Sequence, residues 1–165
     1  MNIYGIPVSG RLSEKYTNIF SKLETNTPPE IWRGIRKVFV DDKEFELITG
    51  FKPAYYLHTE SPFEKGASMG LSIKLEFSDG KTEVIDNFGY FQLPIIIVHS
   101  GTKLDEYFLA AAILHEVGHH NQIKAKLNQY FSYDEVFCHT FAKQFLSEEI
   151  FSRTLERSPF LFWPE

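Results

Sequence analysis

The stretch His115-Glu116-Val117-Gly118-His119-His120 decides how this chain folds, because it closes an apolar, alanine-rich run over residues 107–114. Run and motif together are long enough for a helix, and their apolar character predicts that this helix is buried. His115 and His119 are four residues apart, so on a helix they project from one face, about one turn from each other. Two imidazoles at that spacing can bind one zinc ion, each at roughly 2.0–2.1 Å. The stretch therefore predicts a buried helix that carries a metal site.

The other residues of the motif fit this interpretation. Glu116 follows the first histidine, where its carboxylate can take a proton from a zinc-activated water as that water attacks a peptide carbonyl. Gly118 costs about 1 kcal/mol relative to alanine inside a helix, which indicates close approach of another backbone or of a substrate. His120 points off the ligand face, and we interpret it as a surface histidine, with a substrate contact as the alternative. A structural pair of core histidines is the alternative to a metal site, but unpaired buried imidazoles would be costly.

A catalytic zinc needs a third protein ligand, with water in the fourth position. A second helix is predicted downstream, on which Glu135, Cys138, His139 and Ala142 share one face that is small in its middle. Packed against the first helix, this face brings Glu135 to the metal. It also places His139 one turn further on, as a hydrogen-bond partner for a ligand.

Neighbouring residues leave alternatives open for this second helix. Asp134 is the nearest rival as third ligand, pointing about 100° away around the helix, and His139 is the next. Ser132-x-x-Glu135 also matches a capping box, which would merely start the helix. Tyr130 and Tyr133 can donate a hydrogen bond to a developing oxyanion, although packing is the simpler role for each.

The amino-acid composition limits the classes of protein to which this chain can belong. The 165 residues, 43% hydrophobic and 24% charged, are typical of one folded domain spanning 1–165. A net charge of −5 without a basic stripe argues against nucleic acid as a partner. No secretory signal and no apolar run long enough for a membrane span are visible, so we expect a soluble, cytoplasmic protein without a membrane partner. The single cysteine, Cys138, excludes an internal disulfide, and we interpret it as a small core residue.

The rest of the chain predicts an α+β fold. Apolar spacing predicts an N-terminal helix over 13–23, and a short helical stretch is expected over 30–36. Residues 37–40 then turn to strand-like residues. The four expected strands are 54–58, the hairpin of 71–77 with 82–86 around Asp79-Gly80, and 94–99, where Pro94 favours an edge position. We therefore expect an N-terminal helix and a small, mostly antiparallel sheet of three to four strands, followed by two helices.

The motif and its downstream segment resemble a known family. His115-Glu116-x-x-His119 with Glu135-x-x-Cys138-His139-x-Phe141-Ala142 is similar to the gluzincin pattern His-Glu-x-x-His … Glu-x-x-Ala-Asn/Asp-x-Phe-Ala. That HExxH pattern occurs in the minigluzincins and the ImmA/IrrE-type metallopeptidases. The resemblance, over residues 109–146, implies a compact zincin fold with an active-site helix and a glutamate helix. It also implies Glu135 as third zinc ligand, Glu116 as general base, and substrate added as a β-strand along the sheet edge at 94–100.

The function that we expect is that of a hydrolase, a zinc-dependent metallopeptidase acting on a peptide or protein. The alternative from another class is a zinc-stabilised protein-binding module that uses the sheet edge without turnover. A metal-free structural domain is the third hypothesis. Glu116 favours the enzyme, because a binding module has no use for a base beside the first ligand. Zinc suits two imidazoles, one carboxylate and a water better than nickel, manganese or iron.

Overall fold

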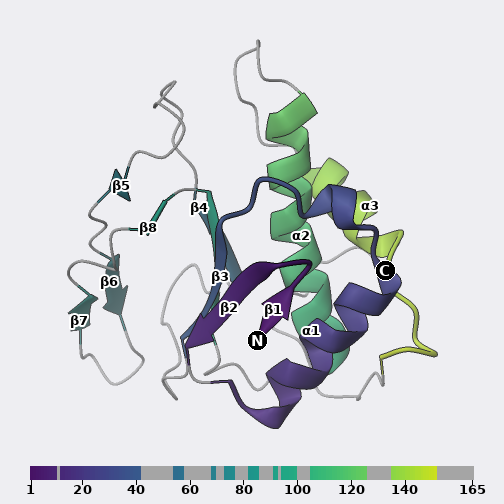
Figure 1. Ribbon diagram of the computed structural model, residues 1–165, viewed down its shortest axis with the longest axis horizontal. Helices are drawn as coiled ribbons and strands as arrows, with labels where there is room; N and C mark the ends of the chain where they lie inside the picture. Colours follow the sequence, from purple (N-terminus) through teal and green to yellow (C-terminus); the bar gives the residue numbers. More distant parts are fainter. Residues whose placement is uncertain are drawn as a thin grey trace.

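The computed structural model describes residues 1–10, 12–41, 54–57, 68–69, 73–76, 82–85, 91–92, 94–99, 105–125 and 135–151. Its elements, in chain order, are β1 (Asn2–Ile3), β2 (Ile6–Gly10), α1 (Glu14–Asn26), the 3-10 turn η1 (Pro29–Ile31), β3 (Lys37–Asp41), β4 (Ala54–Leu57), β5 (Ser68–Met69), β6 (Ile73–Glu76), β7 (Thr82–Ile85), β8 (Phe91–Gln92), β9 (Ile95–His99), α2 (Glu106–Ala125) and α3 (Glu135–Lys143). The fold is α+β, as expected (Figure 1).

The main sheet has five strands in the order β1-β2-β3-β9-β4. Its three central strands run parallel, while β1 and β4 pair antiparallel at the two sides. The expectation of a small, mostly antiparallel sheet of three to four strands is therefore wrong for this sheet, which is mixed. The reason is the N-terminal segment: β1 and β2 were not expected as strands, and α1 with η1 forms the crossover that returns the chain parallel to β2.

The strands of the β1–β2 hairpin are too short to show a clear alternation of apolar and polar residues in the sequence. Its turn is made by Tyr4 and Gly5, which both have positive φ, at 49° and 79°. Two consecutive positive φ values are what a two-residue hairpin turn of the primed type requires, and they match the twist of the strands. Glycine suits this turn, but tyrosine is an unusual residue for it, so the local sequence did not indicate a hairpin.

The expectation of an edge strand over 94–100 is also wrong. β9 lies inside the main sheet, paired with β3 on one side and β4 on the other. Residues 95–98 are all buried, which explains their unbroken apolar run. Pro94 lies just before the strand and accepts a hydrogen bond from the Arg36 backbone N–H through its own carbonyl. Among the described strands the outer positions of this sheet belong to β1 and β4; Ser100 lies outside the described residues.

The hairpin predicted for the middle segment is confirmed, but it is not part of the main sheet. β6 pairs antiparallel with β7, with Ile73 opposite Ile85 and Glu76 opposite Thr82. This hairpin forms a two-stranded sheet separate from the main one, and β5 and β8 form another. Both small sheets lie on the far side of the main sheet from the helices (Figure 1).

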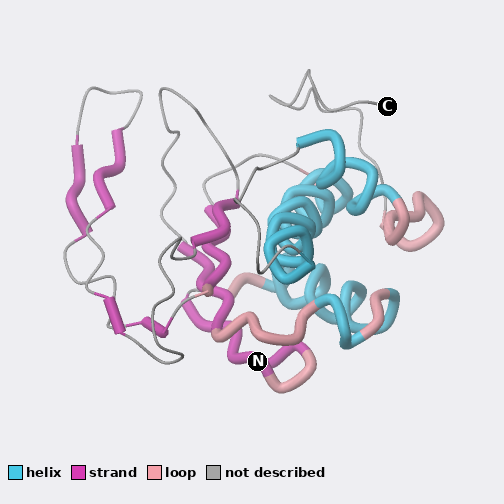
Figure 2. The backbone as a smooth tube through the Cα atoms, turned by 90° about the horizontal axis from the view of Figure 1, so that it is seen from above, coloured by secondary structure: helices cyan, strands magenta, loops and turns pink. Residues whose placement is uncertain are grey.

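The helices cover one face of the main sheet (Figure 2). α1 confirms the predicted N-terminal helix, and its four apolar positions are all buried: Tyr16, Ile19, Phe20 and Leu23. α2 is buried around almost its whole circumference from residue 109 to 120, which makes it the central helix of the layer. The expected helical stretch over 30–36 is only the 3-10 turn η1 followed by a turn. No helix among the described residues is long and apolar enough to cross a membrane.

Candidate metal centre

The candidate metal centre lies where α3 packs against α2, and Gly118 permits this packing. A Cβ added to Gly118 would lie 3.1 Å from the Cα of Cys138 and 3.3 Å from a ring carbon of Phe141. Carbon atoms in ordinary contact are about 3.5–4.0 Å apart, so any larger residue would push α3 away. The expectation that Gly118 marks the close approach of another backbone is confirmed.

This close packing brings Glu135 to the two histidines of the motif. The Glu135 carboxylate lies 2.8 Å from Nε2 of His115 through Oε2, and 3.2 Å from Nε2 of His119 through Oε1. The two imidazole rings are edge to face, with centroids 4.8 Å apart. The Nε2 atoms of two histidines on α2 therefore both lie within 3.2 Å of one carboxylate on α3.

His115, His119 and Glu135 are candidate ligands of a metal ion. Tetrahedral ligands at roughly 2.0–2.1 Å from zinc lie about 3.3–3.4 Å from each other. The observed 2.8 Å and 3.2 Å separations are slightly shorter, so a small outward movement of Glu135 opens the space for an ion. The side chains of His115 and His119 are 8% and 6% exposed, whereas that of Glu135 is 57% exposed. The candidate centre thus has a buried side lined by two imidazoles and an exposed side at the carboxylate.

Glu116 is held on the same buried turn of α2. It follows His115 directly, which places it about 100° around the helix, and it is buried. A carboxylate is costly to bury unless charged or hydrogen-bonding partners surround it. The role of Glu116 as a base beside the first ligand stays a prediction.

His139 was expected one helix turn further from the metal than Glu135, but it lies closer to the candidate metal centre than that. Its ring centroid is 4.6 Å from that of His115, and His115, Glu135 and His139 can offer ligand atoms within 4.8 Å of one another. Burial lowers the pKa of His139 below its usual range; Glu135 opposes this shift and Lys143 adds to it. A neutral imidazole in this place can either support a ligand or bind the ion itself.

Cys138 is the site residue that sequence reasoning assigned to the core alone. It is fully buried, as expected, but its Sγ lies 3.3 Å from Nδ1 of His119. His115, His119 and Cys138 form a second group whose ligand atoms fall within 4.8 Å of one another. The signal was present in the sequence, since Glu135 and Cys138 are three residues apart on one helix face.

The structure contradicts the interpretation of His120 as a surface histidine. It is only 3% exposed, and its ring is held between β4 and the turn after η1. Nε2 of His120 lies 2.8 Å from the Arg33 carbonyl oxygen, so it carries the proton and donates. Nδ1 is then the acceptor, and the Tyr56 hydroxyl donates to it at 2.7 Å. Burial raises the pKa of Tyr56.

The last turn of α2 continues this attachment to the segment around η1. Asn121 donates its side-chain N–H to the carbonyl of Ile31, and Lys124 donates to the carbonyls of Glu30 and Arg33. Burial and the charge of Arg33 lower the pKa of Lys124. The helix that carries the histidines is therefore fixed at its C-terminal end by polar side chains as well as by the core.

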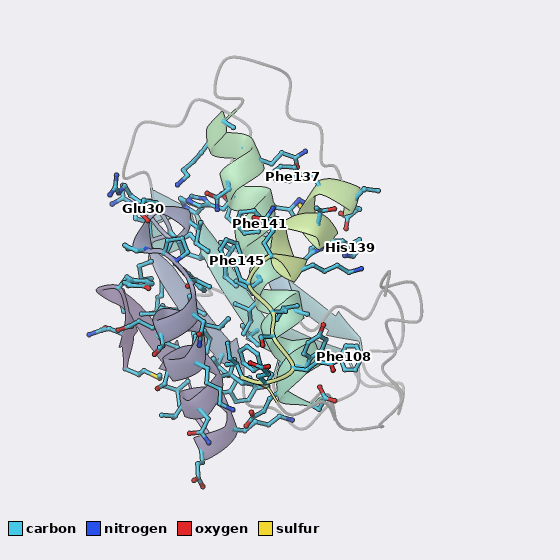
Figure 3. The ribbon with its side chains drawn as sticks, turned by 90° about the vertical axis from the view of Figure 1, so that its right-hand side faces the viewer. Glu30, Phe108, Phe137, His139, Phe141 and Phe145 are labelled. Atoms are coloured by element: carbon cyan, nitrogen blue, oxygen red, sulfur yellow. The ribbon has the colours of Figure 1, made fainter. Side chains whose placement is uncertain are left out.

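Aromatic residues follow one another along α3 and the turn after it. The rings of Phe137 and Phe141 are stacked at 6.2 Å, and those of Phe141 and Phe145 meet at 5.3 Å (Figure 3). Phe141 and Phe145 pack against the core, whereas Val136 and Phe137 are exposed next to Glu135.

Three further candidates, Tyr130, Tyr133 and Asp134, lie outside the described residues. In the described part of the chain, Glu135 contacts both His115 and His119, and the rings of His115 and His139 lie side by side. Glu116 is buried next to His115 on α2. Comparisons of this chain with known protein families, with curated proteins and with solved structures give no match.

Proposed function

We propose that this chain is a zinc-dependent metallopeptidase, in which His115, His119 and Glu135 hold the ion and Glu116 is the general base. The observation that carries the proposal is the convergence of two imidazole Nε2 atoms on one carboxylate, at 2.8 Å and 3.2 Å. Two imidazoles and one carboxylate with an open fourth position are the ligand set of hydrolytic zinc.

Zinc, when bound, supplies a Lewis acid that polarises a peptide carbonyl and lowers the pKa of a water molecule toward about 7. Glu116 accepts the proton of the attacking water and later returns it to the leaving amine as the C–N bond breaks. His115 and His119 exclude water from the closed side, because both are buried. Glu135 offsets part of the charge of the ion from the open side.

The substrate would reach the centre from the side of Glu135. Val136 and Phe137, the next two residues of α3, are exposed, and apolar side chains of a polypeptide can pack on them. With β9 inside the sheet, a substrate strand would pair with the outer edge of β4, an outer strand of the described sheet that packs against α2. The proposed binding edge is therefore 54–57 in place of 94–100.

A zinc-stabilised binding module remains the second candidate, because one observation favours it. His115, His119 and Cys138 are all buried and can offer ligand atoms within 4.8 Å of one another. Structural zinc sites are closed in this way, with no open position for a substrate. Only the metallopeptidase would hydrolyse peptides, so an assay of peptide hydrolysis distinguishes the two candidates.

The test is cleavage of a degenerate peptide library by the zinc-loaded chain, followed by mass spectrometry. We expect Glu116→Gln to keep zinc and lose cleavage, because the amide has nearly the same shape but does not accept the proton. Glu149→Ala is the matched control, since Glu149 is an exposed carboxylate outside the centre, and it should cleave as the native chain does. Native turnover by Glu116→Gln would remove the proposed base.

A further inference from the structure

His119 is contacted by two different side chains through its two ring nitrogens. Nε2 lies 3.2 Å from Oε1 of Glu135, and Nδ1 lies 3.3 Å from Sγ of Cys138. A neutral imidazole has one nitrogen lone pair to give to an ion, because the other nitrogen carries the proton. An ion held together with Glu135 therefore takes the lone pair of Nε2 and leaves Nδ1 facing the sulfur.

We infer that Cys138 is a positioning residue for His119, and that its thiol accepts the Nδ1–H hydrogen bond when Nε2 binds the metal. The inference rests on the proposed function only in requiring a metal at this centre. Histidine ligands almost always donate their second N–H to a carboxylate, a carbonyl or water, which fixes the ring orientation. Here a thiol occupies that place, and it makes Cys138 a partner of a ligand instead of a ligand.

A thiol suits this place because it can both donate and accept a hydrogen bond. Without metal, Nε2 of His119 donates to the Glu135 carboxylate, so Nδ1 carries the lone pair and the Cys138 S–H donates to it. With metal, Nε2 releases its proton to solvent and gives its lone pair to the ion, while Nδ1 takes up a proton from solvent. The Cys138 thiol keeps its own proton, turns the S–H away from Nδ1, and accepts the Nδ1–H hydrogen bond through its sulfur. His119 holds one proton in both states, and the ring need not turn.

Packing keeps the sulfur in this place. Cys138 is fully buried, and its Cα lies only 3.1 Å from where a Cβ at Gly118 would be. The α3 backbone is thus as close to α2 as the glycine permits. Glu135 and Cys138 lie on adjoining turns of α3, so one helix contacts both nitrogens of His119.

The experiment compares zinc affinity, by competition with a chromophoric chelator, in the native chain, Cys138→Ala, Cys138→Ser and Ala142→Gly. We expect Cys138→Ala to weaken zinc binding by about three- to tenfold, the size of one hydrogen bond to a ligand. Cys138→Ser keeps a group that donates and accepts, and should recover part of the loss. Ala142→Gly is the matched control, because it removes one buried methyl from the same face of α3 one turn away; its affinity should stay within about twofold.

Two spectra distinguish positioning from coordination. In the zinc-loaded chain, ¹⁵N NMR of the histidines should show the proton of His119 on Nδ1. The cobalt-substituted chain should lack thiolate-to-cobalt charge-transfer absorption. Such absorption, lost in Cys138→Ala, would make Cys138 a ligand and overturn the inference, as would equal zinc affinity of native chain and Cys138→Ala. A native chain that binds no zinc would overturn the proposed function together with this inference.

Discussion

Replacing Gly118 by alanine tests whether the contact between α2 and α3 sets the metal centre. The new Cβ would lie 3.1 Å from the Cα of Cys138, which is short of ordinary contact by about 0.4 Å or more. The contacting atom is backbone, so relief requires movement of α3 as a whole. Glu135 and Cys138 are carried on that helix, so both would be displaced from His119.

Two effects on stability oppose each other in Gly118→Ala. Alanine favours the helix by about 0.8–1.0 kcal/mol, whereas overpacking costs about 1–3 kcal/mol. The free energy of unfolding of the metal-free chain should therefore fall by only about 0–2 kcal/mol. Zinc affinity should fall more clearly, by about tenfold or more, because ligand geometry is displaced.

Urea unfolding of the metal-free chain and chelator competition for zinc measure the two effects separately. The reasoning requires a larger loss in zinc affinity than in stability. A variant that is about 1 kcal/mol more stable and binds zinc as the native chain does would refute it, because alanine would then fit without moving α3.

Other substitutions test the neighbours of the centre. Tyr56→Phe should destabilise the fold by about 1–3 kcal/mol in urea unfolding at neutral pH, because it leaves the buried Nδ1 of His120 without its donor. Burial raises the pKa of Tyr56 above its ordinary 10.0, so the stability that this phenol contributes is present below about pH 10 and lost as the pH rises further. The native chain should accordingly lose its advantage over Tyr56→Phe in alkaline solution, and a constant difference would contradict the buried hydrogen bond. His139→Asn should weaken zinc binding by about ten- to hundredfold if His139 supports a ligand; complete loss of zinc, as expected for Glu135→Ala, would make His139 a ligand.

Sequence periodicity was enough to predict the local parts of this structure. α1 was predicted because its apolar residues are spaced for one buried face, and the β6–β7 hairpin because alternation and Asp79-Gly80 act over neighbouring residues. The meeting of Glu135 with His115 was predicted for a chemical reason, since two histidines leave a catalytic zinc incomplete.

The same reasoning could not predict which segments far apart in the sequence pair with each other. An apolar run such as β9 is compatible with an edge or a centre, and the choice depends on whether β3 and β4 arrive on both sides. His120 was misassigned for the same reason: its partners, Tyr56 and the Arg33 carbonyl, are 64 and 87 residues away in the chain. Local patterns carry no information about which buried surface a polar side chain will meet.

The most direct test of the metal centre is the zinc content of the purified chain by elemental analysis, for the native protein, Glu135→Ala and Glu149→Ala. The geometry of His115, His119 and Glu135 predicts about one zinc per chain in the native protein and in Glu149→Ala, and a loss of zinc in Glu135→Ala. A native chain without zinc after exposure to the metal, or full zinc in Glu135→Ala, would contradict the three-residue site.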